Sequence, residues 1–143
     1  MEHQHSTWAR ALILEDDLDT LGALGDLLVM NGVSVIQGAQ TIAEAEQLLA
    51  SGFRPSVVVL DLLLGAERGE EFASRLRADP RYRDVPIIAL SGDYLALSRV
   101  SALAHRTFLK PADSAELLRA VHEANSWSVQ ASRERPSLAR AEA

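Results

Sequence analysis

Short apolar runs alternate with amphipathic segments along the chain. The apolar runs predict strands at residues 10–14, 33–36, 56–60, 86–90 and 107–109. Several are almost continuously apolar, which is typical of strands buried on both faces of a parallel sheet. The amphipathic segments predict helices at residues 18–30, 41–52, 70–78, 97–105 and 113–125. The pattern therefore indicates five strand–helix units in tandem.

Two of the predicted helices begin with a capping box. Thr41 is followed three residues later by Glu44, and Asp113 by Glu116 in the same way. In such pairs the first side chain accepts a hydrogen bond from a free amide of the first helical turn. Tandem strand–helix units with these start signals predict an α/β fold, with a parallel sheet, right-handed crossovers and helices on both faces.

The domain limits follow from composition. We expect one domain over residues 8–125, with an N-terminal tail at residues 1–7. Residues 126–143 are rich in Ser, Ala and Arg and lack a clear apolar face, so we expect them to form a flexible C-terminal tail.

The overall composition is that of a globular protein. The 143 residues are 48% hydrophobic and 24% charged. No apolar run approaches the roughly 20 residues that a bilayer requires, and no signal peptide is visible, so we expect a cytoplasmic protein without a membrane partner. The absence of cysteine excludes disulfides, thiolate zinc sites and thiol catalysis. The net charge of −6 argues against direct nucleic-acid binding.

Candidate site residues, most of them polar, follow four of the five predicted strands. They are Glu15, Asp16 and Asp17 after the first strand, Asp61 after the third, Ser91 and Gly92 after the fourth, and Lys110 and Pro111 after the fifth. Lys110 is the only lysine, beside thirteen arginines. Because the carboxyl ends of parallel strands meet at one edge, we expect these residues to lie together.

Each residue also has an ordinary structural explanation when taken singly. The acidic triplet suits the first turn of a helix, where the macrodipole favours negative charge. Ser91-Gly92 is a common turn signal, and Asp61 and Lys110 could end a strand or face solvent. Their joint arrival at one edge of the sheet favours a functional site over these separate explanations.

Clustered carboxylates of this kind require a cation or a proton. Like charges about 4 Å apart repel by roughly 4 kcal/mol at an effective dielectric constant near 20. Ligand sets made only of oxygen favour Mg²⁺, which takes one or two carboxylates and a phosphoryl oxygen. A carboxylate beside Mg²⁺, the Ser91 hydroxyl and the Lys110 ammonium is suited to accept a phosphoryl group, whose charge the cations neutralise.

The sequence at this point resembles a receiver domain of the two-component response regulators. "LILEDD" resembles the first strand and acidic pair of that family, here Glu15 and Asp16, with Asp17 as the alternative second acid. "VVVLDLLL" resembles the phosphoacceptor strand, which implies that Asp61 is phosphorylated. Gly69 matches a glycine of the loop that follows that strand.

Two further motifs extend the resemblance. "IIALSG" implies a phosphate-contacting role for Ser91 and Gly92, and "FLKPAD" implies the same role for Lys110 and a cis peptide bond at Pro111. The family also binds its metal through the backbone carbonyl two residues after the acceptor, here Leu63. The resemblance implies a flavodoxin-like fold with the strand order 2-1-3-4-5, for which a receiver protein is the standard example.

The sequence departs from the family pattern in three places. Gly65 stands where many relatives have proline, and only nineteen positions separate Ser91 from Lys110, so we expect a short fourth helix. The position of the usual aromatic switch residue holds Thr107. Phe108 is one residue away and, by strand alternation, faces the other side of the sheet.

The resemblance implies a single-domain response regulator. Asp61 would be phosphorylated with Mg²⁺ by a sensor histidine kinase or a histidine phosphotransfer protein. We expect no output domain after the last helix, so that signalling proceeds by docking a downstream protein or by phosphorelay. The altered region around Thr107 motivates an alternative, a degenerate receiver-like interaction module that acts without phosphorylation. An aspartyl phosphatase of the haloacid dehalogenase type would need an acid at Leu63, so we expect no enzyme of that class.

Overall fold

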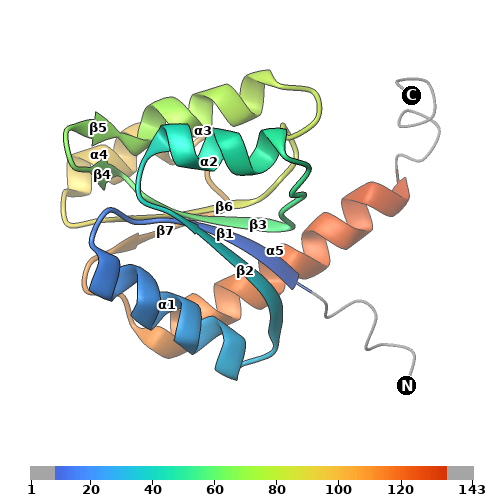
Figure 1. The fold of residues 1–143 in the computed structure, drawn as a ribbon, viewed down its shortest axis with the longest axis horizontal. Coiled ribbons are helices and arrows are strands. Elements are labelled where there is room, and N and C mark those ends of the chain that lie inside the picture. Colours follow the sequence, from blue (N-terminus) through green and yellow to red (C-terminus); the bar gives the residue numbers. More distant parts are fainter. Residues whose placement is uncertain (1–8, 135–143) are drawn as a thin grey trace.

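Five strands pair in parallel in the order β2-β1-β3-β6-β7 (Figure 1). The structure is a computed structural model that describes residues 9–134. Its elements in chain order are β1 (Ala9–Leu14), α1 (Leu18–Met30), β2 (Val33–Ala39), α2 (Ile42–Ala50), β3 (Val57–Asp61), β4 (Leu63–Leu64), β5 (Glu67–Arg68), α3 (Gly69–Ala78), β6 (Ile87–Ser91), α4 (Tyr94–Val100), β7 (Arg106–Leu109) and α5 (Ser114–Glu134). With β4 and β5 set aside as a separate hairpin, this order is the predicted 2-1-3-4-5.

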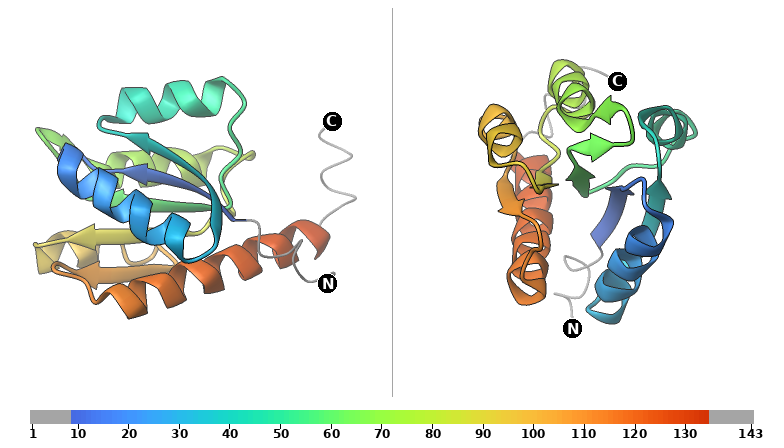
Figure 2. Two further views of the ribbon diagram at one scale, coloured as in Figure 1. Left: turned by 60° about the horizontal axis from the view of Figure 1, so that its bottom comes forward. Right: turned by 90° about the vertical axis from the view of Figure 1, so that its left-hand side faces the viewer.

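The helices form a layer on each face of the sheet (Figure 2). α2, α3 and α4 pack on one face, and α1 and α5 pack on the other. β3 and β6 are buried along their whole length, because each contributes side chains to both layers. Val58 and Leu60 join the first core and Val57 and Val59 the second. This burial explains why these strands are continuously apolar in sequence.

Side chains cap the helices at the positions that the sequence predicts. The Thr41 hydroxyl accepts a hydrogen bond from the Glu44 amide at 3.1 Å, and the Asp113 carboxylate accepts one from the Glu116 amide at 3.0 Å. Each bond satisfies an amide that has no partner inside its helix. Both predicted capping starts are confirmed.

Three elements differ clearly from their predicted ranges. α4 covers 94–100 and not 97–105, because Asp93 accepts a hydrogen bond from the Leu95 amide at 2.9 Å and starts the helix early. β2 extends beyond 33–36 to Ala39. α5 continues to Glu134, so the first half of the predicted C-terminal tail is helical.

The remaining predicted tail segments lie outside the described residues. They are residues 1–7 and the last nine residues of the segment 126–143. Within the part of the chain that the structure describes, no helix has the length and hydropathy needed to cross a membrane.

Candidate functional site

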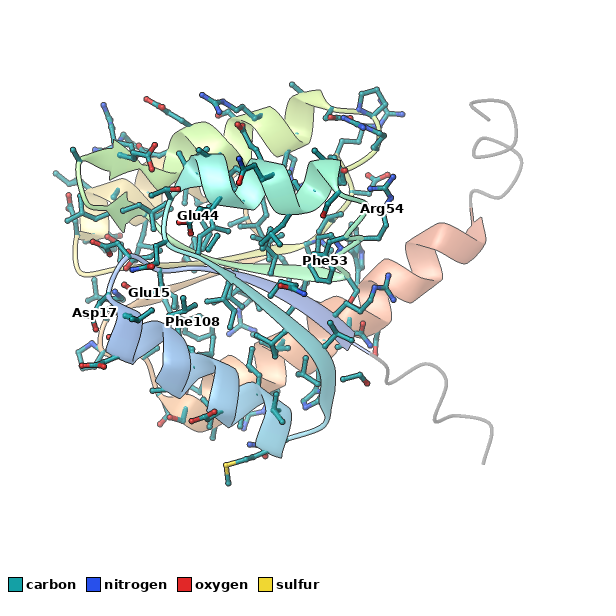
Figure 3. The ribbon with its side chains drawn as sticks, viewed as in Figure 1. Glu15, Asp17, Glu44, Phe53, Arg54 and Phe108 are labelled. Atoms are coloured by element: carbon teal, nitrogen blue, oxygen red, sulfur yellow. The ribbon has the colours of Figure 1, made fainter. Side chains whose placement is uncertain are left out.

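The predicted site residues meet at the carboxyl end of the sheet. They line one open pocket of about 570 Å³, in which Glu15, Asp16, Asp61, Ser91 and Lys110 all take part. Leu63, Gly92 and Asp17 line it as well. Figure 3 shows Glu15 and Asp17 at this end, beside the start of α1. The parallel topology brings these residues together from four strand ends, as the sequence predicts.

Lys110 connects the acids of this pocket. Its Nζ lies 2.7 Å from Oδ2 of Asp61 and 3.4 Å from Oε1 of Glu15. Its backbone amide donates a hydrogen bond to the Ser91 carbonyl at 2.8 Å, and the peptide bond to Pro111 is cis. The lysine side chain therefore comes from the end of β7 and lies across the ends of β1 and β3.

Three carboxylates form a compact set of oxygen donors. Oxygens of Glu15, Asp16 and Asp61 lie within 4.8 Å of one another. Glu15 and Asp61 are buried and Asp16 is exposed, so the set has one open side. Hard oxygen ligands with an open side suit Mg²⁺, which retains several waters. The residues present therefore fit a magnesium site.

Electrostatics at the site reflect this crowding. Burial, with the charge and hydrogen bonding of Asp61, raises the pKa of Glu15 to about 7, although the Asp17 amide and Lys110 oppose the rise. Burial alone would lower the pKa of Lys110, but its hydrogen bond to Asp61 and the two nearby negative charges outweigh burial and raise that pKa. A buried acid and a partly buried lysine thus compensate each other.

The structure distinguishes Asp16 from Asp17. The Asp17 carboxylate caps α1 by accepting hydrogen bonds from the Thr20 amide and hydroxyl, at 2.9 and 2.6 Å, and these bonds lower its pKa. Asp16 instead belongs to the triad, and its Oδ2 accepts a hydrogen bond from the Gly65 amide at 3.0 Å. Asp16 is therefore the second acid, and Asp17 has a helix-capping role.

A short hairpin lies beside the acids where the sequence analysis expected a loop. β4 and β5 pair antiparallel around the two-residue turn Gly65-Ala66, in which Gly65 has φ of 63°. Glu67 of this hairpin accepts a hydrogen bond from the Ile42 amide at 3.0 Å and so caps α2. The signal for this hairpin in the sequence was glycine at the first position of a two-residue turn.

The leucines after Asp61 have two different environments. Leu62 and Leu64 are buried in the core, whereas the Leu63 side chain is 65% exposed. The Leu63 amide donates a hydrogen bond to Oδ1 of Asp61 at 3.0 Å. Gly69 packs directly behind the aspartate, because a Cβ there would lie 2.5 Å from the Asp61 carbonyl oxygen. The backbone on both sides of Asp61 is therefore tightly fixed.

Comparison with known proteins identifies the family. Residues 11–122 match the family model of the response regulator receiver domain. The chain belongs to this family. It is thus a phosphoacceptor signalling module and not a classical enzyme.

Individual relatives agree with this assignment. Protein RcaC of Microchaete diplosiphon is 29% identical over 128 residues, which make up 83% of this chain but only 19% of that protein. A sensor protein from Polaromonas sp. JS666 superposes with a TM-score of 0.75 and 28% identity, covering 84% of this chain and 98% of that one. A CheY-like receiver domain from Methylobacillus flagellatus gives a TM-score of 0.73 at 24% identity, covering 82% and 98%.

The receiver pocket has a charged rim that the sequence analysis missed. Arg99 Nε lies 2.8 Å from Oε2 of Glu70, and Arg68 Nε lies 3.5 Å from Oε1 of the same residue. The hydrogen bond from Arg99 lowers the pKa of Glu70. No sequence signal marks these residues, because only the folded arrangement of β5, α3 and α4 brings them to the pocket.

β7 differs from the usual receiver pattern in the way that the sequence indicates. Phe108 is buried in the core between the sheet, α1 and α5, with the Arg106 guanidinium 5.3 Å above its ring. Thr107 pairs in register with Ala89, which belongs to the opposite core. The only aromatic side chain of this strand therefore faces away from the α4 side.

Proposed function

We propose that this receiver accepts a phosphoryl group on Asp61 from a histidine kinase or a histidine phosphotransfer protein. The observation that carries the proposal is the position of Asp61 between the Lys110 ammonium, at 2.7 Å, and the two other acids of the triad. In this setting the Asp61 carboxylate lies beside a cation and is oriented by a hydrogen bond that the Leu63 amide donates to it. Both conditions favour nucleophilic attack.

Glu15, Asp16, Asp61 and the Leu63 carbonyl would hold Mg²⁺. When bound, Mg²⁺ supplies positive charge beside the equatorial oxygens of the transferring group. The triad oxygens lie close enough together for one ion, and the exposed side of Asp16 leaves an entry for it.

The chain's own residues carry out the transfer. A carboxylate oxygen of Asp61 forms a bond to phosphorus while the phosphorus–nitrogen bond of the donor histidine breaks, and the electron pair stays with the imidazole. Lys110 balances the growing charge on the phosphoryl oxygens. The Ser91 hydroxyl, which accepts a hydrogen bond from the Asp93 amide at 2.9 Å, directs its own proton toward them, with the Gly92 backbone beside it.

The phosphorylated receiver would then signal through another protein. The partner would be either a downstream target that binds only the phosphorylated form, or a relay protein whose histidine receives the phosphoryl group. The chain spans about a fifth of the length of the curated relative RcaC.

Intact mass spectrometry tests the proposal directly. The wild type, incubated with acetyl phosphate and Mg²⁺, should gain the mass of one phosphoryl group, and EDTA should prevent the gain. Asp61→Asn should gain nothing, while the matched control Asp26→Asn, an exposed acid of α1, should gain as much as the wild type. Labelling of Asp61→Asn equal to the wild type would contradict the assignment.

The side-chain arrangement of β7 favours a second candidate function. Because Thr107 replaces the aromatic residue and Phe108 is held in the opposite core, the alternative is an interaction module that works unphosphorylated. No mass gain in the wild type, from acetyl phosphate or from phosphorylated kinase, would support this alternative over the first.

A further inference from the structure

Charge is distributed unevenly along this chain. Residues 11–53 contain seven acids and no lysine or arginine, so all fourteen basic residues lie outside this stretch. The seven acids are Glu15, Asp16, Asp17, Asp19, Asp26, Glu44 and Glu46. The stretch folds into most of β1 and into α1, β2 and α2, which form the β2 edge of the sheet (Figure 1). The β2 edge of the sheet therefore carries acidic residues that have no basic residue beside them in the sequence.

Two of these acids have no role in the fold or the site. Glu15 and Asp16 belong to the triad, Asp17 and Glu44 cap helices, and Glu46 pairs with Arg75. Asp19 and Asp26 of α1 are exposed, and among the described residues neither has an ion-pair partner. They remain available to a partner.

An apolar stripe runs along α1 beside these acids. Its members are Leu18, Gly22, Gly25 and Val29, and their spacing of four, three and four residues is that of the contact seam between two packed helices. Leu18 is 65% and Val29 is 55% exposed. With Leu21, Ile36 and Gly38 the stripe lines an open groove of about 530 Å³ between α1 and β2. We call this groove the α1–β2 seam.

The two glycines of the seam are not required by the fold. Both lie inside a helix, where glycine is less favourable than alanine, and neither has positive φ. A Cβ added at Gly22 would meet nothing within 4 Å, and one at Gly25 would meet only Ile36 Cγ2 at 3.7 Å. What glycine provides here is a notch into which another backbone can approach closely.

The seam lies on the free side of α1. α1 and α5 cover the same face of the sheet, and β2 is the edge strand beyond α1 (Figure 2). No element of the described chain lies over the groove, so its apolar side chains stay exposed to solvent. An edge strand with exposed apolar neighbours is a ready interaction surface.

We propose that the α1–β2 seam docks a helix of another protein that carries apolar residues flanked by lysine or arginine. Asp19 and Asp26 each come one residue after a member of the stripe, Leu18 and Gly25. One residue of a helix is a rotation of about 100°, so both acids lie along the same side of the stripe, where they face one flank of such a helix. A second copy of this chain would place the same acids against each other, which repels. The seam contains no residue of the phosphorylation site, so this inference is separate from the proposed function.

Binding of two synthetic helical peptides tests the proposal. Both carry the same stripe of leucine and alanine, one with lysine and the other with glutamate on its polar face. Titrated into the full ¹⁵N-labelled chain, the lysine peptide should shift amide signals of α1 and β2, and its affinity should fall as salt is added. The glutamate peptide should not bind.

Variants then distinguish specific binding at the seam from non-specific electrostatic binding to an acidic protein. Gly22→Met replaces a helical glycine, so it should raise the Tm. Because the new side chain fills the notch, the affinity for the lysine peptide should fall at least about tenfold. Asp26→Lys should weaken it too, whereas Glu71→Lys, a matched change on the exposed side of α3, should not. Phosphorylation of Gly22→Met by acetyl phosphate should be normal.

Three results of the peptide titrations would overturn the inference. They are the absence of binding, signal shifts centred on α2 instead of the seam, and unchanged affinity of Gly22→Met. Sedimentation that shows a dimer in the wild type and a monomer in Gly22→Met would also overturn it, because the seam would then belong to a second copy.

Discussion

Lys110 Nζ lies 2.7 Å from Oδ2 of Asp61, although 49 positions separate the two residues along the chain. β7 and β3 bring them together, with β6 between the two strands. The same ammonium is 3.4 Å from Glu15, so one cation offsets a cluster of three carboxylates. The charge balance of the site therefore rests on Lys110 whenever no divalent ion is bound.

Replacing this lysine should destabilise the protein when no divalent ion is bound. In EDTA, Lys110→Met should lower the free energy of unfolding by about 1–2 kcal/mol, because it leaves buried carboxylates without their counter-charge in a pocket that water screens in part. Millimolar Mg²⁺ should restore much of the loss. Urea unfolding with and without Mg²⁺ measures both effects.

Arg75→Met provides the control for that change. Arg75 pairs with Glu46 on the surface, where both side chains are about half exposed, so its loss should cost much less stability than the loss of Lys110 and be insensitive to Mg²⁺. Equal losses for the two variants would mean that Lys110 is an ordinary surface cation.

The raised pKa of Glu15 makes stability depend on pH. The folded protein holds this proton up to a pH of about 7, whereas the unfolded chain releases it near 4.5. Without divalent ions, stability should therefore fall as the pH rises between these values, since the native state binds the extra proton. Glu15→Gln should remove this slope and be more stable than the wild type by about 1 kcal/mol at pH 8, and equal to it near pH 4. Urea unfolding of both proteins across this pH range checks the prediction, and parallel stability curves would show that folding does not raise the pKa of Glu15.

Gly69→Ala should be strongly destabilising. Its Cβ would lie 2.5 Å from the Asp61 carbonyl oxygen and 2.9 Å from the Leu62 Cα, and neither backbone atom can move cheaply. We expect a loss of roughly 2–3 kcal/mol. Gly22→Ala, a helical glycine with nothing within 4 Å, should instead gain about 0.5–1 kcal/mol. Denaturant midpoints of the two variants on opposite sides of the wild type would confirm this.

The fold was predictable because its signals are local. Continuous apolar runs such as 56–60 mark strands that are buried on both faces, and Thr41 and Asp113 mark helix starts by capping chemistry. The convergence of Glu15, Asp61 and Lys110 then follows from parallel topology, which places all strand ends at one edge.

What could not be predicted depends on contacts between distant segments. The hydrogen bonds of Gly65 to Asp16 and of Glu67 to Ile42 join residues far apart, and the strands that carry them are only two residues long. The early start of α4 was missed for another reason: Asp93 in a turn sequence has no periodic apolar pattern before it. The extension of α5 was missed because residues beyond 125 lack a strong apolar face.

The same substitution should affect Mg²⁺ binding at Asp16 and leave it unchanged at the neighbouring Asp17. Asp16→Asn removes one charge of the triad while its amide oxygen can still accept the Gly65 hydrogen bond, so the hairpin should remain in place. Mg²⁺ affinity should fall at least about tenfold, because a neutral oxygen replaces a carboxylate ligand. Asp17→Asn keeps a good cap for α1, so its Mg²⁺ affinity and its stability should stay close to those of the wild type. Isothermal titration calorimetry with Mg²⁺ decides between them: a loss on Asp17→Asn with Asp16→Asn unaffected would make Asp17 the ligand and overturn the geometry described above.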